Sequence, residues 1–395
     1  MAKPFYLLLL IAYMGFIGLG LPDATHGVTW PSVRDSFGLG NSGLGLIIAG
    51  GGLGYLCSSF IAGRLVAKLG VGTLLAGSSL VVTLGLAGFA LAPNWLWFLA
   101  ATPLIGLGSG AIDAGLNTYA AQHFSTRHMN WLHASFGIGV TTSPLLVTGV
   151  LVLGWDWRWG YWLVAALLAA MTGLFFLTRH WWQRDANSAT KAPSDSPWAT
   201  FRHPVVVIQM PLFFVYTGLE LGLGQWAFTI LSESRDFTLA QAGTWTGLYW
   251  GSLAIGRFVF GWLVSYVATD SIIRLATVLA VVGISLLTLN LQASLSIFGL
   301  LLTGFACAPI FPSLVSRTHE RLGPAAAGHA IGFQVSAAML GAMTLPFLSG
   351  LLSKWVNLEA ILWFCLSQGV LLLLLHEALL RVANRKTLSK PKEKT

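Results

Sequence analysis

Three acidic residues lie deep inside apolar segments that are each long enough to cross a bilayer. They are Asp23, Asp113 and Glu220, whereas the other eleven of the 14 acidic residues fall in loops, tails or segment ends. A carboxylate in the middle of such a helix costs about 2.5–3.5 kcal/mol on insertion scales, so it normally faces a partner or a water-filled path. Burial disfavours its charged form, which suits a group that takes up and releases protons. We expect these residues to couple transport to protons; structural, paired carboxylates are the alternative.

Polar and aromatic side chains near these acids are candidates for ligand binding. Asn117 follows Asp113 by one helical turn and faces the same way, and its amide suits a hydroxyl-rich ligand. His26 follows Asp23 by three residues and can share a proton with it if the helix continues. The full candidate set is Asn117, His133, Gln225, Trp226, Tyr249, Trp250, Gln334 and His26. Ordinary helix packing is the alternative for the histidines and the aromatic residues.

The composition is that of a membrane protein. Hydrophobic residues make up 55% of the chain and charged residues 9%, against about 25% charged residues in a soluble domain. The 45 glycines of the 395 residues fit helices that pack closely in lipid. The glycine-rich stretches lack the Lys-Ser or Lys-Thr ending of a nucleotide loop. We therefore expect no enzyme, no cofactor, no metal and no nucleic-acid partner, and transport driven by ion gradients.

The apolar segments define the elements that must position these residues. A window of about 19 residues finds twelve of them, and a polar stretch at 179–204 divides them into six and six. Their approximate ranges are 5–30, 42–66, 73–93, 95–122, 130–153, 159–178, 205–230, 241–266, 271–290, 293–316, 327–353 and 357–380. The prediction is an all-α membrane protein with twelve transmembrane helices in two pseudo-symmetric six-helix bundles. The bundles are 1–178 and 205–380, joined by a cytoplasmic linker at 179–204, with a basic cytoplasmic tail at 381–395.

Basic residues predict the orientation. With the amino terminus inside, 17 Lys and Arg residues lie on the predicted cytoplasmic side and 4 on the other, a bias that places both termini in the cytoplasm. The net charge of +8 therefore reflects orientation and carries no indication of nucleic-acid binding. From the compact length and short loops we expect a bacterial inner membrane and a monomer, with the lipid bilayer as its surroundings.

The two halves repeat each other weakly. Residues 63–66 (Gly-Arg-Leu-Val) correspond to residues 261–264 (Gly-Trp-Leu-Val), and Gly106 corresponds to Gly304 at the same offset of 198. Parallel repeats about an axis along the membrane normal are typical of a transporter whose halves rock around a central site.

The loop after the second segment carries a family resemblance. Residues 63–72, Gly-Arg-Leu-Val-Ala-Lys-Leu-Gly-Val-Gly, resemble the signature of the major facilitator superfamily, with Ala67 where an acid is usual and Val71 where a basic residue is usual. The resemblance implies gating roles for Arg64 and Lys68. Arg257 lies near the inner end of the eighth segment, where it can serve a second gate or neutralise Glu220 or Asp113.

A narrower resemblance is to the fucose–proton symporter branch and its sodium-dependent glucose transporter relatives. It rests on residues 113–117 (Asp-Ala-Gly-Leu-Asn), 129–137 around His133, 216–226 around Glu220, and Pro309-Ile-Phe-Pro312. The resemblance implies a coupling role for Asp113 and, less directly, for Asp23.

Three functions fit these observations. The first is a secondary transporter that moves a small polar solute, above all a sugar, by proton-coupled symport with alternating access. A sodium-coupled sugar symporter is the alternative with the same cavity, and a proton-coupled antiporter exporting drugs or metabolites uses the same fold. A non-transporting membrane enzyme or sensor would need a catalytic constellation or a sizeable soluble domain, and the sequence shows neither.

Overall fold

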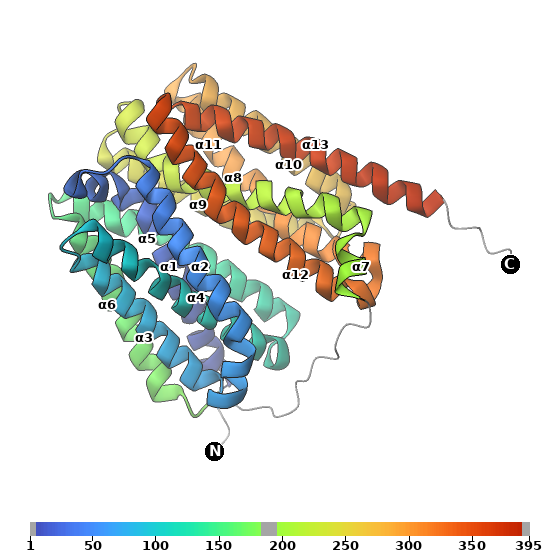
Figure 1. Cartoon of the computed structure of the whole chain (residues 1–395), viewed down its shortest axis with the longest axis horizontal. Coiled ribbons are helices and arrows are strands. Elements are labelled where there is room, and N and C mark those ends of the chain that lie inside the picture. The colour runs from blue at the N-terminus through green and yellow to red at the C-terminus, as the bar shows by residue number, and fades with distance from the viewer. Residues whose placement is uncertain (1–4, 183–195, 389–395) are drawn as a thin grey trace. The chain divides into compact units, whose positions relative to one another are not determined.

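The computed structural model describes residues 5–182 and 196–388, and every regular element within these ranges is a helix (Figure 1). Six long helices come before the linker: α1 (Phe5–Phe37), α2 (Ser42–Leu69), α3 (Val71–Ala90), α4 (Trp95–His123), α5 (Thr126–Val152) and α6 (Trp157–Thr178). The linker itself contains a short helix, α7 (Pro197–Phe201). The remaining helices are α8 (Pro204–Ser234), α9 (Leu239–Leu263), α10 (Thr269–Leu289), α11 (Ala293–Cys307), α12 (Ile310–Trp355) and α13 (Ala360–Leu388).

The predicted fold class is confirmed. Eleven helical segments of the described residues are long and apolar enough to cross a membrane. Two of these share α12, because Gly323 adopts a φ of 76° inside it and separates a segment at 293–323 from one at 326–355. The predicted span at 241–266 corresponds to α9, which is not one of these eleven segments.

Local sequence signals account for several helix ends. The side chains of Asn94, Ser125 and Asp156 accept hydrogen bonds from backbone N–H groups in the first turns of α4, α5 and α6, which satisfies donors that have no partner inside the helix. Gly70 separates α2 from α3 with a φ of 77°, a conformation that favours glycine. Helix α1 instead continues through Pro22 and Pro31.

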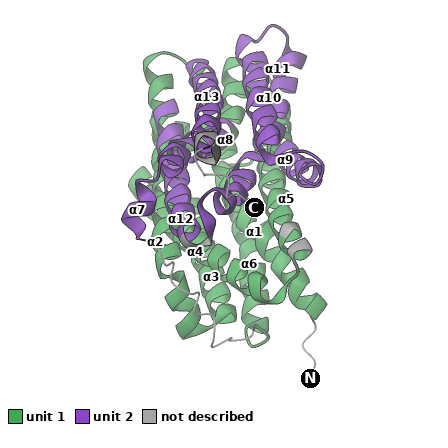
Figure 2. Ribbon diagram, turned by 90° about the vertical axis from the view of Figure 1, so that its right-hand side faces the viewer, with its two compact units in different colours: residues 1–188, 224–251, 350–358 green, residues 189–223, 252–349, 359–395 purple. Residues whose placement is uncertain are grey.

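Contacts group the chain into two compact units (Figure 2). The first unit consists of residues 1–188, 224–251 and 350–358, and the second of residues 189–223, 252–349 and 359–395. The first unit therefore contains α1 to α6, the later part of α8 and the first half of α9. The division into six-helix bundles at 1–178 and 205–380, joined by the linker at 179–204, stays a prediction.

Glycines bring helices of the first unit into backbone contact. A Cβ atom on Gly106 of α4 would lie 1.8 Å from the carbonyl oxygen of Gly51 in α2, and a Cβ atom on Gly139 of α5 would lie 2.0 Å from that of Ile17 in α1. The second unit uses the same device, because a Cβ atom on Gly341 of α12 would lie 1.9 Å from the carbonyl oxygen of Phe214 in α8. Such close approach is how helices pack where lipid supplies no hydrophobic driving force.

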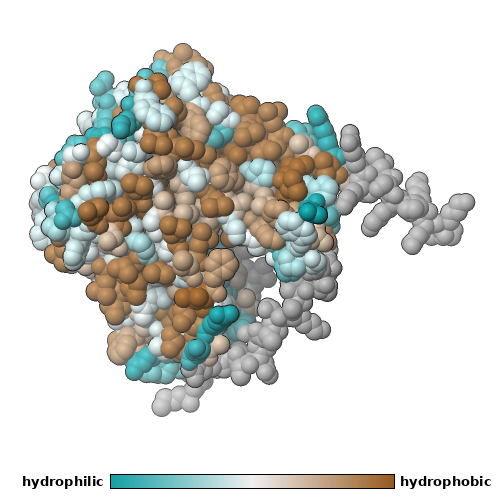
Figure 3. All heavy atoms as spheres, viewed as in Figure 1, coloured by the Kyte–Doolittle hydropathy of each residue, from teal (hydrophilic) through white to brown (hydrophobic). Residues whose placement is uncertain are grey.

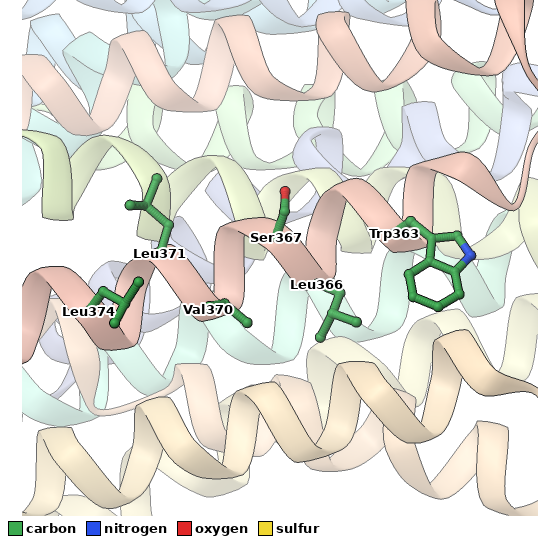
Figure 4. A pocket seen from close by; sticks show the side chains of 6 residues that line it. All are labelled: Trp363, Leu366, Ser367, Val370, Leu371 and Leu374. Atoms are coloured by element: carbon green, nitrogen blue, oxygen red, sulfur yellow. The ribbon is translucent and has the colours of Figure 1, made fainter.

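The surface is apolar, as a lipid environment requires. Hydrophobic side chains cover most of the face drawn in Figure 3, and many large ones are exposed, including Phe60, Leu96 and Leu374. One shallow hollow is lined by Trp363, Leu366, Ser367, Val370, Leu371 and Leu374, all from α13 (Figure 4). Because a single helix forms it and its lining is almost entirely apolar, we assign this hollow to the lipid-facing surface.

Candidate functional site

Asp113 lies in the middle of α4 with a donor on each carboxylate oxygen. The hydroxyl of Tyr55, from α2, donates to Oδ2 at 2.7 Å. The side-chain amide of Asn117, one turn further along α4, donates to Oδ1 at 2.9 Å. All three side chains are partly buried. Both oxygens of Asp113 accept a hydrogen bond, which fits an ionised carboxylate. Charge-assisted hydrogen bonds of this kind are about twice as strong as neutral ones.

Asp23 shares this region of the first unit with Asp113. The Asp23 side chain of α1 is exposed although its neighbours Pro22 and Ala24 are buried. An acid in the middle of a membrane-spanning segment is expected to face a partner or a water-filled path. His133 of α5 is also exposed and packs its ring against Phe16 at 5.3 Å between centroids.

The later part of α8 adds polar atoms to the same unit. Gln225 donates through Nε2 to the backbone oxygen of Asp23 at 2.6 Å, while its buried Oε1 has no hydrogen-bond partner in the described part of the chain. Trp250 packs against Gly224, where a Cβ atom would lie 2.2 Å from the indole ring. Its buried Nε1 is likewise without a partner in the described ranges. This unit therefore holds one buried acceptor and one buried donor without a hydrogen-bond partner among the described residues.

The other two aromatic candidates are packed in the core. Trp226 and Tyr249 are fully buried, and the ring of Tyr249 meets Trp250 edge-on at 5.2 Å between centroids. A Cβ atom on Gly350 would lie 3.0 Å from the Trp226 ring. These contacts give Trp226 and Tyr249 a packing role, and the contact of Tyr249 helps to position Trp250.

His26 forms its hydrogen bond with Tyr161 of α6, although its spacing from Asp23 suggested that these two residues share a proton. Its Nδ1 lies 3.0 Å from the hydroxyl of Tyr161 in α6, and that hydroxyl is also 2.8 Å from Oγ1 of Thr29. The imidazole ring packs on Phe89 at 5.4 Å between centroids. The structure thus joins His26 to a buried hydroxyl chain within α1 and α6.

Glu220 occupies a separate cluster in the second unit. It is 8% exposed, and its Oε2 accepts a hydrogen bond from the hydroxyl of Tyr216, one turn earlier in α8. Arg257 of α9 places Nη2 at 3.8 Å from Oε1. Of the two roles considered for Arg257, the structure shows it next to Glu220 as a counter-ion. The two predicted gating residues of α2, Arg64 and Lys68, are exposed near the end of that helix.

Gln334 belongs to a buried amide network of the second unit. Its Nε2 donates to Oε1 of Gln209 at 2.8 Å, and its side chain also bonds the hydroxyl of Thr318. The side chains of Gln209, Thr318 and Gln334 are all fully buried. Three helical segments are joined in this way, which indicates a structural role beside the ligand-binding role that the sequence suggested.

Two tyrosines were absent from the predicted site. Tyr216 could have been found from its spacing, because it precedes Glu220 by one helical turn and residues at this spacing share a helix face. Tyr55 had no such signal: it reaches Asp113 from another helix, and only the packing of α2 on α4 brings the two together.

The two acids of the first unit, Asp23 and Asp113, differ in their surroundings. Within the described residues, no three or more His, Cys, Asp or Glu side chains are placed to share a metal ion. Asp113 carries hydrogen-bond donors on both oxygens, whereas Asp23 has an accessible carboxylate, so the two members of the pair differ in environment.

The chain is similar to known membrane transporters over most of its length. A family model described as Major Facilitator Superfamily matches residues 6–333 and, again, residues 227–395. The Mus musculus protein named Sodium-dependent glucose transporter 1A is 21% identical, and the alignment covers 94% of this chain and 96% of that protein.

Solved structures show the same fold. A variant of the nucleoside transporter NupG aligns with a TM-score of 0.81 at 13% identity, covering 93% of this chain and 98% of that one. The E. coli fucose:proton symporter FucP aligns with a TM-score of 0.61 at 16% identity, covering 95% of this chain and 99% of that one. The resemblance expected from the sequence, to the fucose–proton symporter and sodium-dependent glucose transporter branch, is confirmed.

Proposed function

Because this chain belongs to the Major Facilitator Superfamily, we propose that it is a secondary active transporter that carries a sugar together with protons by alternating access. Membership establishes a membrane transporter of a small solute. The substrate class, the coupling ion and the direction are parts of the proposal. We place the protein in a bacterial inner membrane, with both termini in the cytoplasm because of the distribution of Lys and Arg.

The carboxylate pair of Asp23 and Asp113 carries the proposal of proton coupling. Both lie in the first unit, within helices that are long enough to span a bilayer. Acidic residues inside membrane spans commonly mark the proton relays of transporters. Protonation of the pair removes one negative charge from the unit, which lowers the cost of a conformational change that alters its access to water.

Unpaired polar atoms support a hydroxyl-rich substrate. Gln225 offers a buried acceptor at Oε1, and Trp250 offers a buried donor at Nε1, neither with a partner in the described segments. A buried polar atom without a partner costs about 1–3 kcal/mol, so a ligand that bonds to either atom recovers that free energy. The face of Trp250 can also stack on the apolar side of a sugar ring. Names of relatives such as the mouse sodium-dependent glucose transporter point to the same class.

Sodium coupling is the second candidate. The mouse relative is named for sodium dependence, and the oxygens of Asp23, Asp113 and Asn117 are the hard ligands that small cations prefer. In this version the carboxylates stay ionised and hold the cation, and the transport cycle no longer depends on their protonation.

Uptake into proteoliposomes tests these alternatives. The purified protein is assayed with a panel of labelled sugars under an imposed pH gradient, and then under a sodium gradient at constant pH. Accumulation driven by the pH gradient, with Asp113→Asn keeping exchange but losing uphill uptake, is the expected result. Accumulation with sodium alone favours the cation site. Normal uphill uptake by the Asp113→Asn protein would refute the coupling role, and an absence of sugar transport under both gradients would redirect the panel to exported compounds.

A further inference from the structure

Tyr55 is the residue of α2 that contacts the carboxylate pair. Its hydroxyl lies 2.7 Å from Oδ2 of Asp113. Helix α2 has no acidic residue of its own, and its only basic side chains lie near its end, at Arg64 and Lys68. Tyr55 is therefore the side chain through which α2 contacts the pair.

Close helix packing fixes the position of the phenol. A Cβ atom on Gly106 of α4 would lie 2.8 Å from the backbone nitrogen of Tyr55, and one on Gly110 would lie 2.8 Å from its backbone oxygen. Gly110 precedes Asp113 by three residues, about one turn of α4. The backbones of α2 and α4 touch one turn before Asp113. The backbone of Tyr55 therefore has little freedom to move, and this holds its hydroxyl near Oδ2 of Asp113.

The Tyr55 hydroxyl is one of several polar or titratable groups in the region of Asp113. Asp23 of α1 and His133 of α5 are the other titratable side chains that we place in the candidate site of the first unit. Helix α3 also packs on α4, and it contains no titratable residue. Among these side chains, Tyr55 of α2 is the one that donates a hydrogen bond to the Asp113 carboxylate, at 2.7 Å.

We propose that Tyr55 is a positioning residue for proton coupling: its hydroxyl stabilises the ionised form of Asp113 and so sets the pH range over which transport responds to protons. The inference rests on the proposed function, because it assumes that the carboxylate pair takes up the coupling proton. An O–H donor binds a carboxylate more strongly than a protonated acid. Removal of the donor therefore favours protonation, and the response moves to higher pH.

Tyr55→Phe tests the inference, because it removes the hydroxyl and keeps the ring that packs in the bundle. The measurement is the midpoint of the pH dependence of sugar exchange, together with substrate-induced proton uptake. We expect the midpoint to rise by about one pH unit, with the folded protein recovered normally. Ser59→Ala is the matched control, because its exposed hydroxyl bonds the backbone oxygen of Tyr55 without touching the carboxylate; its midpoint should equal that of the wild type.

Two further variants separate the possible failures. In protein carrying Asp113→Asn, whose exchange should no longer depend on pH, adding Tyr55→Phe should leave exchange independent of pH. Replacement of Tyr55 by 3-fluorotyrosine, a more acidic phenol of nearly the same shape, should move the midpoint to lower pH. If the wild type shows no pH dependence, or if Asp113→Asn keeps it, the proposed function fails. If Asp113→Asn loses it while both Tyr55 variants match the wild type, the inference about Tyr55 is overturned and the proposed function stands.

Discussion

Gly27 provides the sharpest test of how α1 and the later part of α8 meet within the first unit. A Cβ atom at Gly27 would lie 2.7 Å from the backbone oxygen of Gln225 and 3.0 Å from its Cα. Both atoms belong to the backbone, so no side-chain rotation can relieve the clash. Gly27→Ala therefore forces the helices apart by roughly 0.5 Å, and overpacking of this kind costs about 1–3 kcal/mol. The same movement stretches the hydrogen bond from Gln225 to the Asp23 oxygen, now 2.6 Å.

The cost falls only on the arrangement in which these two segments touch. In a transporter with two accessible states, a free energy of this size changes the ratio of their populations by about 5–150-fold. Helices that must separate during transport would then spend less time together in the Gly27→Ala protein. The expected effect is thus a population shift, with the helices themselves intact.

A cross-link between the helix ends measures that population. Arg34 of α1 and Glu233 of α8 form a two-pronged ion pair at 2.8 and 3.0 Å, so cysteines at both positions report the state in which the ends meet. Cys57, the exposed native cysteine, is first replaced by serine. A bismaleimide whose length matches the two lost side chains should react about tenfold more slowly when Gly27→Ala is added.

Gly149→Ala in α5 is the control, since a Cβ atom there meets nothing within 4 Å. It should cross-link at the rate of the parent protein. Equal rates for Gly27→Ala and Gly149→Ala, in proteins that elute identically on size exclusion, would show that the contact at Gly27 does not limit the closed arrangement.

Three further predictions concern stability and ion pairing. Glu233→Gln should weaken its coupling to Arg34 by about 1 kcal/mol, because the pair is only partly buried; a double-mutant cycle of melting temperatures at low and high salt checks this, and a salt-independent, additive result would contradict it. Gly106→Val should prevent recovery of folded protein, because its Cβ would lie 1.8 Å from a backbone oxygen. Gly77→Val should fold, because the space around its Cβ is open. Size-exclusion chromatography in detergent distinguishes the two outcomes. Gln334→Leu should destabilise the protein by about 1–3 kcal/mol by leaving buried amide partners unpaired; an unchanged melting temperature with lost sugar affinity would instead favour direct ligand binding.

Several features of the fold followed from local sequence alone. Eleven of the twelve predicted spans each correspond to one helix, and the span at 293–316 covers α11 and the start of α12. Runs of about 20 apolar residues form helices because lipid leaves every backbone N–H and C=O to be satisfied internally. The break at Gly323 falls in the predicted gap between the spans at 293–316 and 327–353. The short helix at 197–201 was not predicted, because it lies in a polar stretch that has no apolar periodicity. Continuity of α1 through Pro22 resolved one open alternative, because a proline followed by an acid can equally well end a helix.

By itself the sequence determined the class of protein, the places of its apolar helices and the three intramembrane carboxylates, because the bilayer penalises charge at every such position regardless of the neighbours. Asn117 could be paired with Asp113, and Tyr216 with Glu220, because one helical turn separates the members of each pair. Only the tertiary structure decided that α2, through Tyr55, supplies the second donor to Asp113, that His26 turns to Tyr161, and that Gln225 reaches the backbone at Asp23. These contacts depend on which glycines let two backbones touch, and that choice is made by packing between segments far apart in the chain.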